Sequence, residues 1–432
     1  KERFVFLPLL YELCVGDAQL DEVAPTYKSL LKGTNIQFRQ ANIQGIDIEH
    51  DDVYLTQGDK LHYDSLIVAT GSDVHLENIP GASTHALPFY TIEDCFELKK
   101  RLTLLESTLG AAAPQSKQSA ALKVVIVGGG YSGVELALNM KERLRKMGME
   151  DGQAKVTLIH RGEEILECAT EHNRKTGLGR LEKAGVKMET GMSVIEVLPC
   201  DDEKGNNDEG DLFAELRGRC RVVVESKDNT EGPIANEMID ADVLLWTAGA
   251  MSTNTAHGIL NSKLPRDASG RIVTDQFLRA KGADNVFALG DCARVKKVPF
   301  GATAAVAMQQ APYAAWNVYA SDRKKSKNGR SRKDELKLLP FQYIDLGEMM
   351  TLGGEDATIS SMGLVELSGP AASVLRRLIY AVRMPTLQQA LTAAISSSSK
   401  RFESLLTRGS LTKKEKSLTS SIGSAKKIID WQ

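Results

Sequence analysis

Cysteine is scarce in this sequence and is never clustered. The six cysteines among 432 residues form no CxxC pair and no Cys/His group, which argues against a zinc site and against a disulfide framework. We therefore expect no metal site, and a reducing compartment fits this cysteine usage.

A strong net charge and a long hydrophobic run are also missing. Lys and Arg number 54 against 56 Asp and Glu, so the overall charge gives no reason to expect a nucleic-acid partner. The longest charge-free stretch, 298–321, contains Pro299, Pro312 and two adjacent glutamines, and it predicts a buried helix rather than a membrane span. With 42% hydrophobic residues, the composition is that of a globular protein of about two to three domains.

The chain opens at Lys1 and shows neither a signal peptide nor a transit peptide, so we interpret it as a fragment. Low-complexity segments divide it: a linker at 110–121, a polar loop at 201–211 and a basic run at 323–333. The basic run is interpreted as a solvated insertion.

Four short apolar runs end in glycine, at 66–71, 124–130, 243–249 and 286–291. Runs of this length bounded by glycine predict strands buried on both faces, as in the parallel sheets of α/β proteins. We therefore predict an α/β fold with more than one such sheet.

The strongest motif lies at residues 122–144, where a predicted strand delivers Gly128, Gly130 and Gly133 in GxGxxG spacing before a predicted helix. Gly128 permits a tight turn, Gly130 lets the backbone approach a pyrophosphate, and Gly133 allows close helix packing. The alternative is a purely structural glycine turn. The strand and helix on either side favour dinucleotide binding.

Coenzyme choice depends on the end of the next predicted strand, 155–160. An acidic residue there would bind the ribose 2′-hydroxyl and favour NADH. The sequence has His160 and Arg161 instead, and arginine binds phosphate well, which favours NADPH. The alternative is a surface His-Arg pair, with Glu163 or Glu164 binding the ribose.

A second dinucleotide site is indicated at 278–293, where a predicted strand ends in Gly290 and Asp291 and a helix can begin. The glycine lets backbone amides approach a phosphate, and the aspartate accepts hydrogen bonds from a sugar hydroxyl. An ordinary helix N-cap is the alternative. Two further glycine-terminated strands can bring backbone close to a cofactor, at Thr70-Gly71 and at Gly249.

In their order, these four motifs resemble the flavoproteins with two dinucleotide-binding domains. The resemblance implies FAD and NAD(P)H on separate Rossmann-like domains, with the NAD(P) domain inserted into the FAD domain. Disulfide reductases of this fold pass electrons through a nearby cysteine pair. Because the nearest cysteines in sequence are Cys200 and Cys220, we expect no thiol relay.

The segments FVFLPLLYELCVG, 302–317 and 339–360 narrow the resemblance to type II NAD(P)H:quinone oxidoreductases, especially the C1 subfamily of plants, algae and cyanobacteria. This implies a non-pumping peripheral enzyme that reduces a membrane prenylquinone, of plastoquinone, ubiquinone or naphthoquinone type. It also implies a plastid membrane (thylakoid or plastoglobule), a mitochondrial membrane, or both.

Two features depart from that family. Its first βαβ unit, which holds the FAD pyrophosphate, is not in this sequence, so FAD binding by this chain stays open. The quinone-site pattern AQxAxQ has Ala305 in place of its first glutamine and keeps Gln309. The resemblance therefore assigns quinone contact to this segment with one amide lost.

Glu135 is the acidic residue that the resemblance places near flavin and nicotinamide, where it orients the nicotinamide or assists proton supply. The alternative is a carboxylate in the first turn of the helix, favoured by the helix dipole.

The C-terminal segment 369–432 is basic, with 11 Lys and Arg against 3 Asp and Glu. On a helix over 371–383, five aliphatic residues share one face and three arginines take the opposite one: Val374, Leu375, Leu378, Ile379 and Val382 against Arg376, Arg377 and Arg383. A second apolar set follows: Leu387, Leu391 and Ile395. Basic amphipathic helices bind membrane surfaces. Docking on the protein core, or in a homodimer interface, is the alternative.

We therefore predict six segments: the first part of an FAD domain (1–109), a linker (110–121), an NAD(P) domain (122–250), the second part of the FAD domain (251–321), a basic insertion (322–335), and a C-terminal strand and amphipathic-helix region for membrane association (336–432). The predicted function is electron transfer from NADPH or NADH through FAD to a membrane quinone. The alternatives are a reductase of the ferredoxin-reductase or monodehydroascorbate-reductase type, or a non-catalytic nucleotide-binding scaffold.

Overall fold

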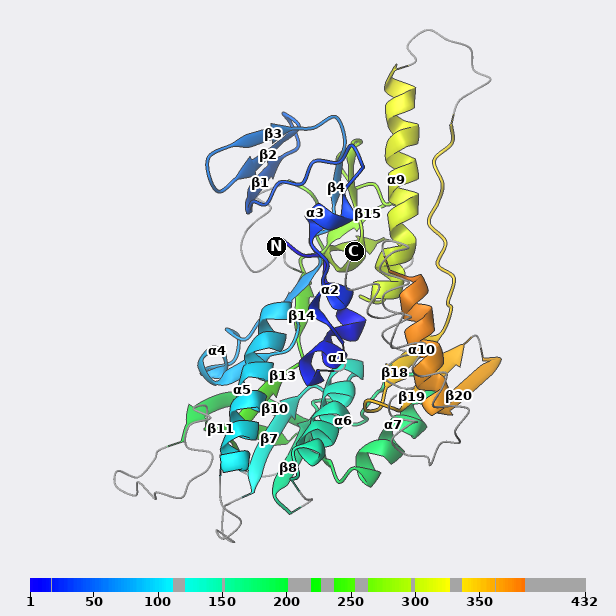
Figure 1. Cartoon of the computed structure of the whole chain (residues 1–432). Coiled ribbons are helices and arrows are strands. Elements are labelled where there is room, and N and C mark those ends of the chain that lie inside the picture. Colours follow the sequence, from blue (N-terminus) through cyan, green and yellow to red (C-terminus); the bar gives the residue numbers. More distant parts are fainter. Residues whose placement is uncertain are drawn as a thin grey trace, which may run out of the picture.

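The computed structural model describes residues 1–16, 18–111, 121–149, 152–200, 219–226, 237–252, 263–296, 300–326, 336–361 and 363–384. Within these ranges the chain forms two α/β units and a C-terminal layer (Figure 1). The polar loop, the second apolar set of the C-terminal segment and most of the predicted linker lie outside them.

The first unit is built on a five-stranded parallel sheet in the order β6–β13–β7–β8–β9. Consecutive residues of β7 enter two cores. Val124 and Ile126 pack with helices, and Val125 and Val127 pack against an antiparallel sheet in the order β10–β11–β12. This explains the unbroken apolar run and confirms the predicted double burial. The elements are β6 (Ala86–Pro88), α5 (Ile92–Ala111), β7 (Leu122–Val127), α6 (Tyr131–Lys146), β8 (Ala154–Ile159), α7 (Glu171–Lys183), β9 (Lys187–Glu189), β10 (Met192–Pro199), β11 (Cys220–Ser226), β12 (Glu237–Ala241) and β13 (Val243–Trp246).

The second unit is interrupted by the first. Strand β4 (Leu66–Val68) pairs in parallel with β16 (Val286–Ala288), although the whole five-stranded sheet lies between them in sequence. The chain leaves the second unit through β5 (Ser72–Val74) and returns to it through β14 (Ala250–Ser252), and these two strands pair antiparallel. The predicted insertion of one dinucleotide-binding unit into another is therefore confirmed. The unit also contains β1 (Ile43–Asp47), β2 (Asp52–Leu55), β3 (Lys60–His62), β15 (Ile272–Thr274), η3 (Gly290–Cys292) and β17 (Ala293–Val295).

Two details of the second unit differ from the sequence prediction. The chain passes from the second unit into the first before residue 109, which was the predicted end of the first FAD-domain segment. The reason is that β6 and α5 belong to the five-stranded sheet and its helical layer. Strand β4 is not buried on both faces, since Ile67 is 41% exposed.

Helix α9 (Ala304–Ser326) lies at the surface, so the predicted buried helix is wrong. Only one stripe of α9 faces the protein, and Met308, Trp316 and Tyr319 are exposed. The helix also extends into the first residues of the segment that we expected to be a basic insertion. The buried stripe is Val306, Gln310, Ala314, Asn317 and Ala320. In the part of the chain described, no helix is long and apolar enough to cross a membrane.

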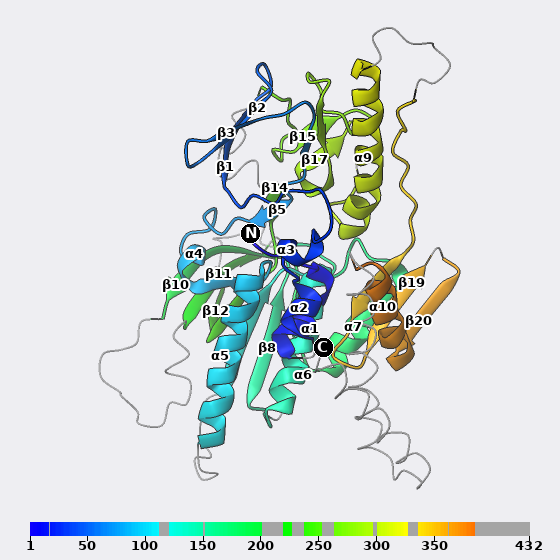
Figure 2. The ribbon, with the colours of Figure 1, turned by 45° about the horizontal axis from the view of Figure 1, so that its top comes forward.

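The C-terminal layer is the antiparallel sheet β18–β19–β20 with α10 packed on it (Figure 2). The sheet lies against α6 and α7 of the first unit, and helices from the N-terminus contact α5 and α6. The elements are β18 (Glu348–Thr351), β19 (Ala357–Ser361), β20 (Val365–Gly369) and α10 (Pro370–Val382), with η1 (Leu7–Leu9), α1 (Leu10–Val15), α2 (Leu20–Val23) and α3 (Tyr27–Leu30) from the N-terminus. The short helix α4 (Ala82–His85) contacts β6 and β10 of the first unit.

Candidate functional site

The three motif glycines have three different structural reasons to be glycine. Gly128 has φ +119°, a region that side-chain-bearing residues rarely adopt. A Cβ on Gly133 would lie 1.7 Å from the Gly128 carbonyl oxygen, whereas a Cβ on Gly130 would have no atom within 4 Å. Gly128 and Gly133 are therefore required by the fold, whereas Gly130 leaves open space above the backbone.

That open space lies at the N-terminus of α6. Gly130 is the N-cap of this 16-residue helix, and no side chain caps it. The unpaired amides and the helix dipole make such a terminus suited to a phosphate group. The geometry therefore fits a dinucleotide pyrophosphate.

His160 supports the glycine turn. The Gly129 N–H donates to His160 Nδ1 at 3.1 Å, and the imidazole fills the space where a Cβ on Gly129 or Gly162 would lie. Its neighbour Arg161 is exposed and forms no ion pair with another described residue. Glu164, one alternative ribose ligand, pairs with Arg174.

Glu135 is buried between α6, β18 and α10. Its Oε1 accepts a hydrogen bond from the Thr351 N–H at 2.8 Å. Burial raises the pKa of this carboxyl to about 8, against the opposing effect of the Arg376 charge. Because α6 has no acidic residue in its first turn, the helix-dipole alternative for Glu135 does not hold.

We expect Glu135→Gln to make thermal stability less dependent on pH. Folding raises the carboxyl pKa from 4.5 to about 8, so its contribution to stability is complete below about pH 4.5 and is lost as the pH rises through 8. The variant should therefore gain Tm over the unmodified protein progressively between pH 5 and 8. A Tm difference that is constant over this range would contradict the burial argument.

The second predicted phosphate site is arranged differently from the expectation. After β16 the chain forms only the 3₁₀ turn η3 and enters β17, so the predicted helix is wrong. The thiol of Cys292 is buried and points to the carbonyls of Val68 and Leu289, which fixes the chain against β4. The Gly290 N–H donates to Gln310 Oε1 at 2.7 Å, so in this structure that amide is paired within the protein.

Asp291 is held in place across the two parallel strands. Its Oδ2 accepts a hydrogen bond from Ser72 Oγ at 2.8 Å, and Ser72 Oγ lies 2.6 Å from the Tyr90 hydroxyl. Thr70 and Gly71 precede Ser72 and hydrogen-bond to Cys292. The ends of β4 and β16 therefore meet at one edge, as parallel pairing predicts.

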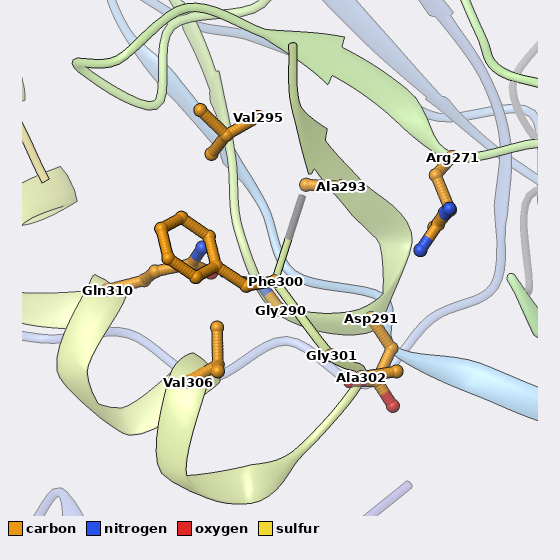
Figure 3. A pocket seen from close by; sticks show the side chains of 10 residues that line it. All are labelled: Arg271, Gly290, Asp291, Ala293, Val295, Phe300, Gly301, Ala302, Val306 and Gln310. Carbon is orange, nitrogen blue, oxygen red and sulfur yellow. Dashed lines mark hydrogen bonds between the residues drawn. The ribbon is translucent and has the colours of Figure 1, made fainter. Parts of the chain in front are cut away.

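A small pocket opens beside Asp291 (Figure 3). Gln310, which sequence reasoning missed although it follows Gln309 directly, lies in its wall. The enclosed space has room for no more than about one water molecule, so the pocket in this form does not enclose a cofactor group. The lining is Arg271, Gly290, Asp291, Ala293, Val295, Phe300, Gly301, Ala302, Val306 and Gln310.

Both polar atoms of the Gln309 side-chain amide hydrogen-bond to the backbone of Ile344. Its Nε2 donates to the Ile344 carbonyl at 2.9 Å, and its Oε1 accepts from the Ile344 N–H at 3.0 Å. The neighbouring Ala305 is partly buried on the first turn of α9. Gln309 therefore fixes the extended segment after residue 336 along α9.

The structure brings one pair of cysteines together that sequence separation concealed. Cys14 of α1 and Cys95 of α5 are both buried, and the neighbouring Cys95 thiol together with burial raises the pKa of the Cys14 thiol. A thiol with a raised pKa is a poor nucleophile. The geometry therefore gives no support to a thiol relay at this pair.

A family profile described as pyridine nucleotide-disulphide oxidoreductase matches residues 3–314. Demethylphylloquinone reductase NdbB of Synechocystis sp. is 34% identical over 403 residues, covering 92% of this chain and 86% of that protein. Alternative NAD(P)H-ubiquinone oxidoreductase C1, chloroplastic/mitochondrial, of Arabidopsis thaliana is 34% identical over 419 residues, covering 91% and 73%.

The fold is shared with two solved structures. NDH2 from Plasmodium falciparum in complex with NADH superposes with a TM-score of 0.74 at 17% identity, covering 93% of this chain and 92% of that one. The sulfide:quinone oxidoreductase of Aquifex aeolicus follows with a TM-score of 0.67 at 16% identity. Matches at this identity show the fold alone. The sequence relatives and the profile show that the chain belongs to the pyridine nucleotide-disulphide oxidoreductase family and, within it, to the type II NAD(P)H:quinone oxidoreductases.

Proposed function

We propose that this protein transfers electrons from NADPH or NADH through FAD to a membrane quinone. The open N-terminus of α6 above Gly130 is the observation that carries the proposal. The 34% identity to two quinone-reducing relatives over more than nine-tenths of the chain supports the acceptor class.

On the coenzyme side, the amides at the start of α6 would bind the pyrophosphate. Gly128 and Gly133 allow the tight turn between β7 and α6, and His160 stabilises that turn by accepting a hydrogen bond from the Gly129 N–H. Arg161, exposed beside the turn, would bind a 2′-phosphate.

For the flavin, Asp291, Gly71 and Gly249 would contact part of FAD. Asp291, fixed by Ser72, presents a carboxylate for a sugar or polyol hydroxyl, and Arg271 lines the same pocket (Figure 3). Gly71 and Gly249, where a Cβ would meet no atom within 4 Å, leave backbone accessible at the same crossing between the units. Bound FAD would supply the two-electron step between coenzyme and quinone.

Glu135 would act beside the nicotinamide coenzyme as a protonated carboxyl. With its pKa raised to about 8, the carboxyl is largely protonated near neutral pH and can donate a hydrogen bond or a proton. A carboxyl with the ordinary pKa of glutamate would be ionised there and could do neither.

The function is tested on the purified full-length protein. We expect a bound flavin spectrum that NADPH or NADH bleaches without oxygen, and that a soluble quinone restores. A protein that binds NAD(P)H but carries no flavin after reconstitution with FAD would favour the scaffold alternative.

Arg161→Glu should shift coenzyme preference toward NADH. A carboxylate at this position repels a 2′-phosphate and can bind a ribose 2′-hydroxyl, so kcat/KM for NADPH should fall by about tenfold or more, equivalent to about 1.4 kcal/mol. Steady-state kinetics with both coenzymes measures this. Lys175→Gln, at an exposed position of α7, is the control and should leave both kcat/KM values unchanged. Unchanged kcat/KM values for both coenzymes would remove Arg161 from the site.

Gln309→Leu should slow quinone reduction and spare flavin reduction. The variant removes the amide that the family pattern assigns to the quinone and releases Ile344. Stopped-flow spectroscopy separates the two half-reactions. Trp316→Phe is the matched control, because it loosens the same segment at the Lys337 carbonyl. Equal slowing in both variants would assign the effect to the segment and not to the Gln309 amide.

We also propose that α10 attaches the protein to a membrane. Its aliphatic side chains face outward, with Val374 42%, Leu378 44% and Val382 83% exposed, which agrees with the predicted apolar face. Arg376 does not share the predicted polar face, because it is buried against Glu12. The name of the Arabidopsis thaliana relative, which places that protein in chloroplasts and mitochondria, supports a plastid or mitochondrial location for this protein.

A further inference from the structure

An ion pair is buried where α10 meets the N-terminal helix α1. Two guanidinium nitrogens of Arg376 donate to Glu12 Oε1, at 2.7 and 2.6 Å, and the side chains are 2% and 5% exposed. The guanidinium also lies over the Tyr380 ring, 4.9 Å from its centre, and the Tyr380 ring meets the Phe6 ring edge-on. Both large side chains on the inward side of α10 therefore contact the N-terminal segment.

The other inward positions of α10 carry small side chains. Ala372, Ser373 and Ala381 are buried, and Ala372 packs against residues of β19. The larger aliphatic side chains lie outward and are between 38% and 83% exposed: Val374, Leu375, Leu378 and Val382. The helix thus turns its less aliphatic side toward the protein.

This orientation is the reverse of the usual one. A helix at a protein surface ordinarily turns its aliphatic stripe toward the core and its charged residues toward water. Turning α10 about its axis would bury the aliphatic stripe and bring Arg376 into water. The burial of apolar surface favours that alternative, so a different contact holds the observed orientation.

The ion pair is the contact that distinguishes the two orientations. Glu12 is buried in α1, which packs on α5 and α6, so it stays out of water whichever way α10 is turned. If Arg376 turned outward, the Glu12 carboxylate would be left buried without a cation, which is strongly unfavourable. The carboxylate on α1 therefore opposes the alternative orientation.

The same pair is a poor source of stability. Glu12 Oε2 and Arg376 Nε have no hydrogen-bond partner within the described ranges, and unpaired polar atoms in a buried site are unfavourable. A buried ion pair can often be replaced by apolar residues with no loss of stability. The pair is therefore better suited to fixing an orientation than to stabilising the fold.

We propose that the ion pair between Glu12 and Arg376 selects the orientation of α10 and thereby creates its exposed aliphatic face, a surface suited to anionic lipid. The identity of this partner rests on the proposed attachment of α10 to a membrane. The orientation itself is a property of the protein alone and is measured without lipid.

Two adjacent positions report which side of α10 faces outward. Val382 is 83% exposed and Ala381 is 3% exposed. A cysteine is placed at either position, and its reaction with a maleimide is followed by peptide mass spectrometry, which separates it from native cysteines such as the exposed Cys168. With the ion pair intact, Val382→Cys should react at least about tenfold faster than Ala381→Cys.

The decisive variant replaces both charges, Glu12→Leu together with Arg376→Met, because it leaves no buried charge without a partner. The helix should then turn its aliphatic side inward. The reaction of Val382→Cys should slow by about tenfold and that of Ala381→Cys should accelerate, while Tm should not fall. A helix that is only loosened would expose Ala381→Cys and leave Val382→Cys as reactive as before, which would overturn the proposal.

Two further variants provide the controls. Arg376→Lys keeps a cation opposite Glu12 and should keep the original labelling pattern. Arg377→Met removes a neighbouring cation that reaches the Gly354 carbonyl, and it should also leave the pattern unchanged. An unchanged pattern in the double variant overturns the proposal. So does unfolding of the double variant, because the pair would then be required for stability.

Vesicles of phosphatidylcholine and phosphatidylglycerol separate this proposal from membrane attachment. If the labelling pattern inverts in the double variant and co-sedimentation with the vesicles falls with it, both proposals are supported. If the pattern inverts although the unmodified protein does not bind the vesicles, the orientation proposal stands and attachment through α10 fails. If the unmodified protein binds and the pattern does not change, attachment stands and the orientation proposal fails.

Discussion

Gly130→Val should produce a folded protein that binds NAD(P)H at least about tenfold more weakly, a loss of about 1.4 kcal/mol. A Cβ at this position meets no protein atom within 4 Å, and φ of −80° is acceptable for valine. The added methyl groups would occupy the space that a pyrophosphate needs to reach the α6 amides. Calorimetric titration with NADPH and NADH measures the affinity, and thermal unfolding measures the stability.

Two other glycines provide the controls for this prediction. Gly179 lies exposed on α7, and a Cβ there also meets nothing within 4 Å, so Gly179→Val should bind coenzyme normally. Gly133→Ala should fail to fold normally, because its Cβ would lie 1.7 Å from the Gly128 carbonyl oxygen. Undiminished affinity in Gly130→Val would mean that the coenzyme does not pass over this turn.

Replacing Leu378 and Val382 together by glutamate should abolish binding to anionic vesicles. Both side chains are exposed on α10. Each aliphatic side chain contributes roughly 1.5–3 kcal/mol when fully buried, and less at an interface, while the new carboxylates are repelled by anionic lipid. Co-sedimentation should therefore fall by at least about tenfold, with NADPH oxidation by a soluble quinone preserved.

Substitution on the exposed face is a better test than deletion of the helix. Removing α10 would remove Arg376 and leave the Glu12 carboxylate buried without its partner, which typically costs about 3–5 kcal/mol. Leu61→Glu, on the exposed strand β3, is the control for added charge. If the double variant still binds the vesicles as the unmodified protein does, α10 is not the attachment site.

The glycine turn between β7 and α6 could be predicted from sequence because its causes are local. The spacing of Gly128, Gly130 and Gly133 fixes a turn between an adjacent strand and helix, and steric contacts within a few residues decide it. The apolar runs predicted the parallel strands for the same reason, since burial on both faces requires consecutive apolar residues.

The partners of several site residues could not be predicted, because they come from distant parts of the chain. Gln309 is paired with Ile344, Glu135 with Thr351, and Cys14 with Cys95. Nothing in the sequence around Gln309 indicates that the extended segment after residue 336 runs back along α9. The charge-free stretch 298–321 also predicted a buried helix, because composition does not show which side of a helix the fold covers.

The sequence by itself determined the family, the order of the two units, the glycine turn and the amphipathic pattern of α10, because each follows from short-range spacing. Only the tertiary structure decided which side of α10 faces the protein. The aliphatic side lies outward, and Arg376 turns inward because Glu12, far away in sequence, offers a buried carboxylate. The same long-range packing decided that Glu135 is withdrawn from water, and desolvation together with its charged neighbours sets its pKa.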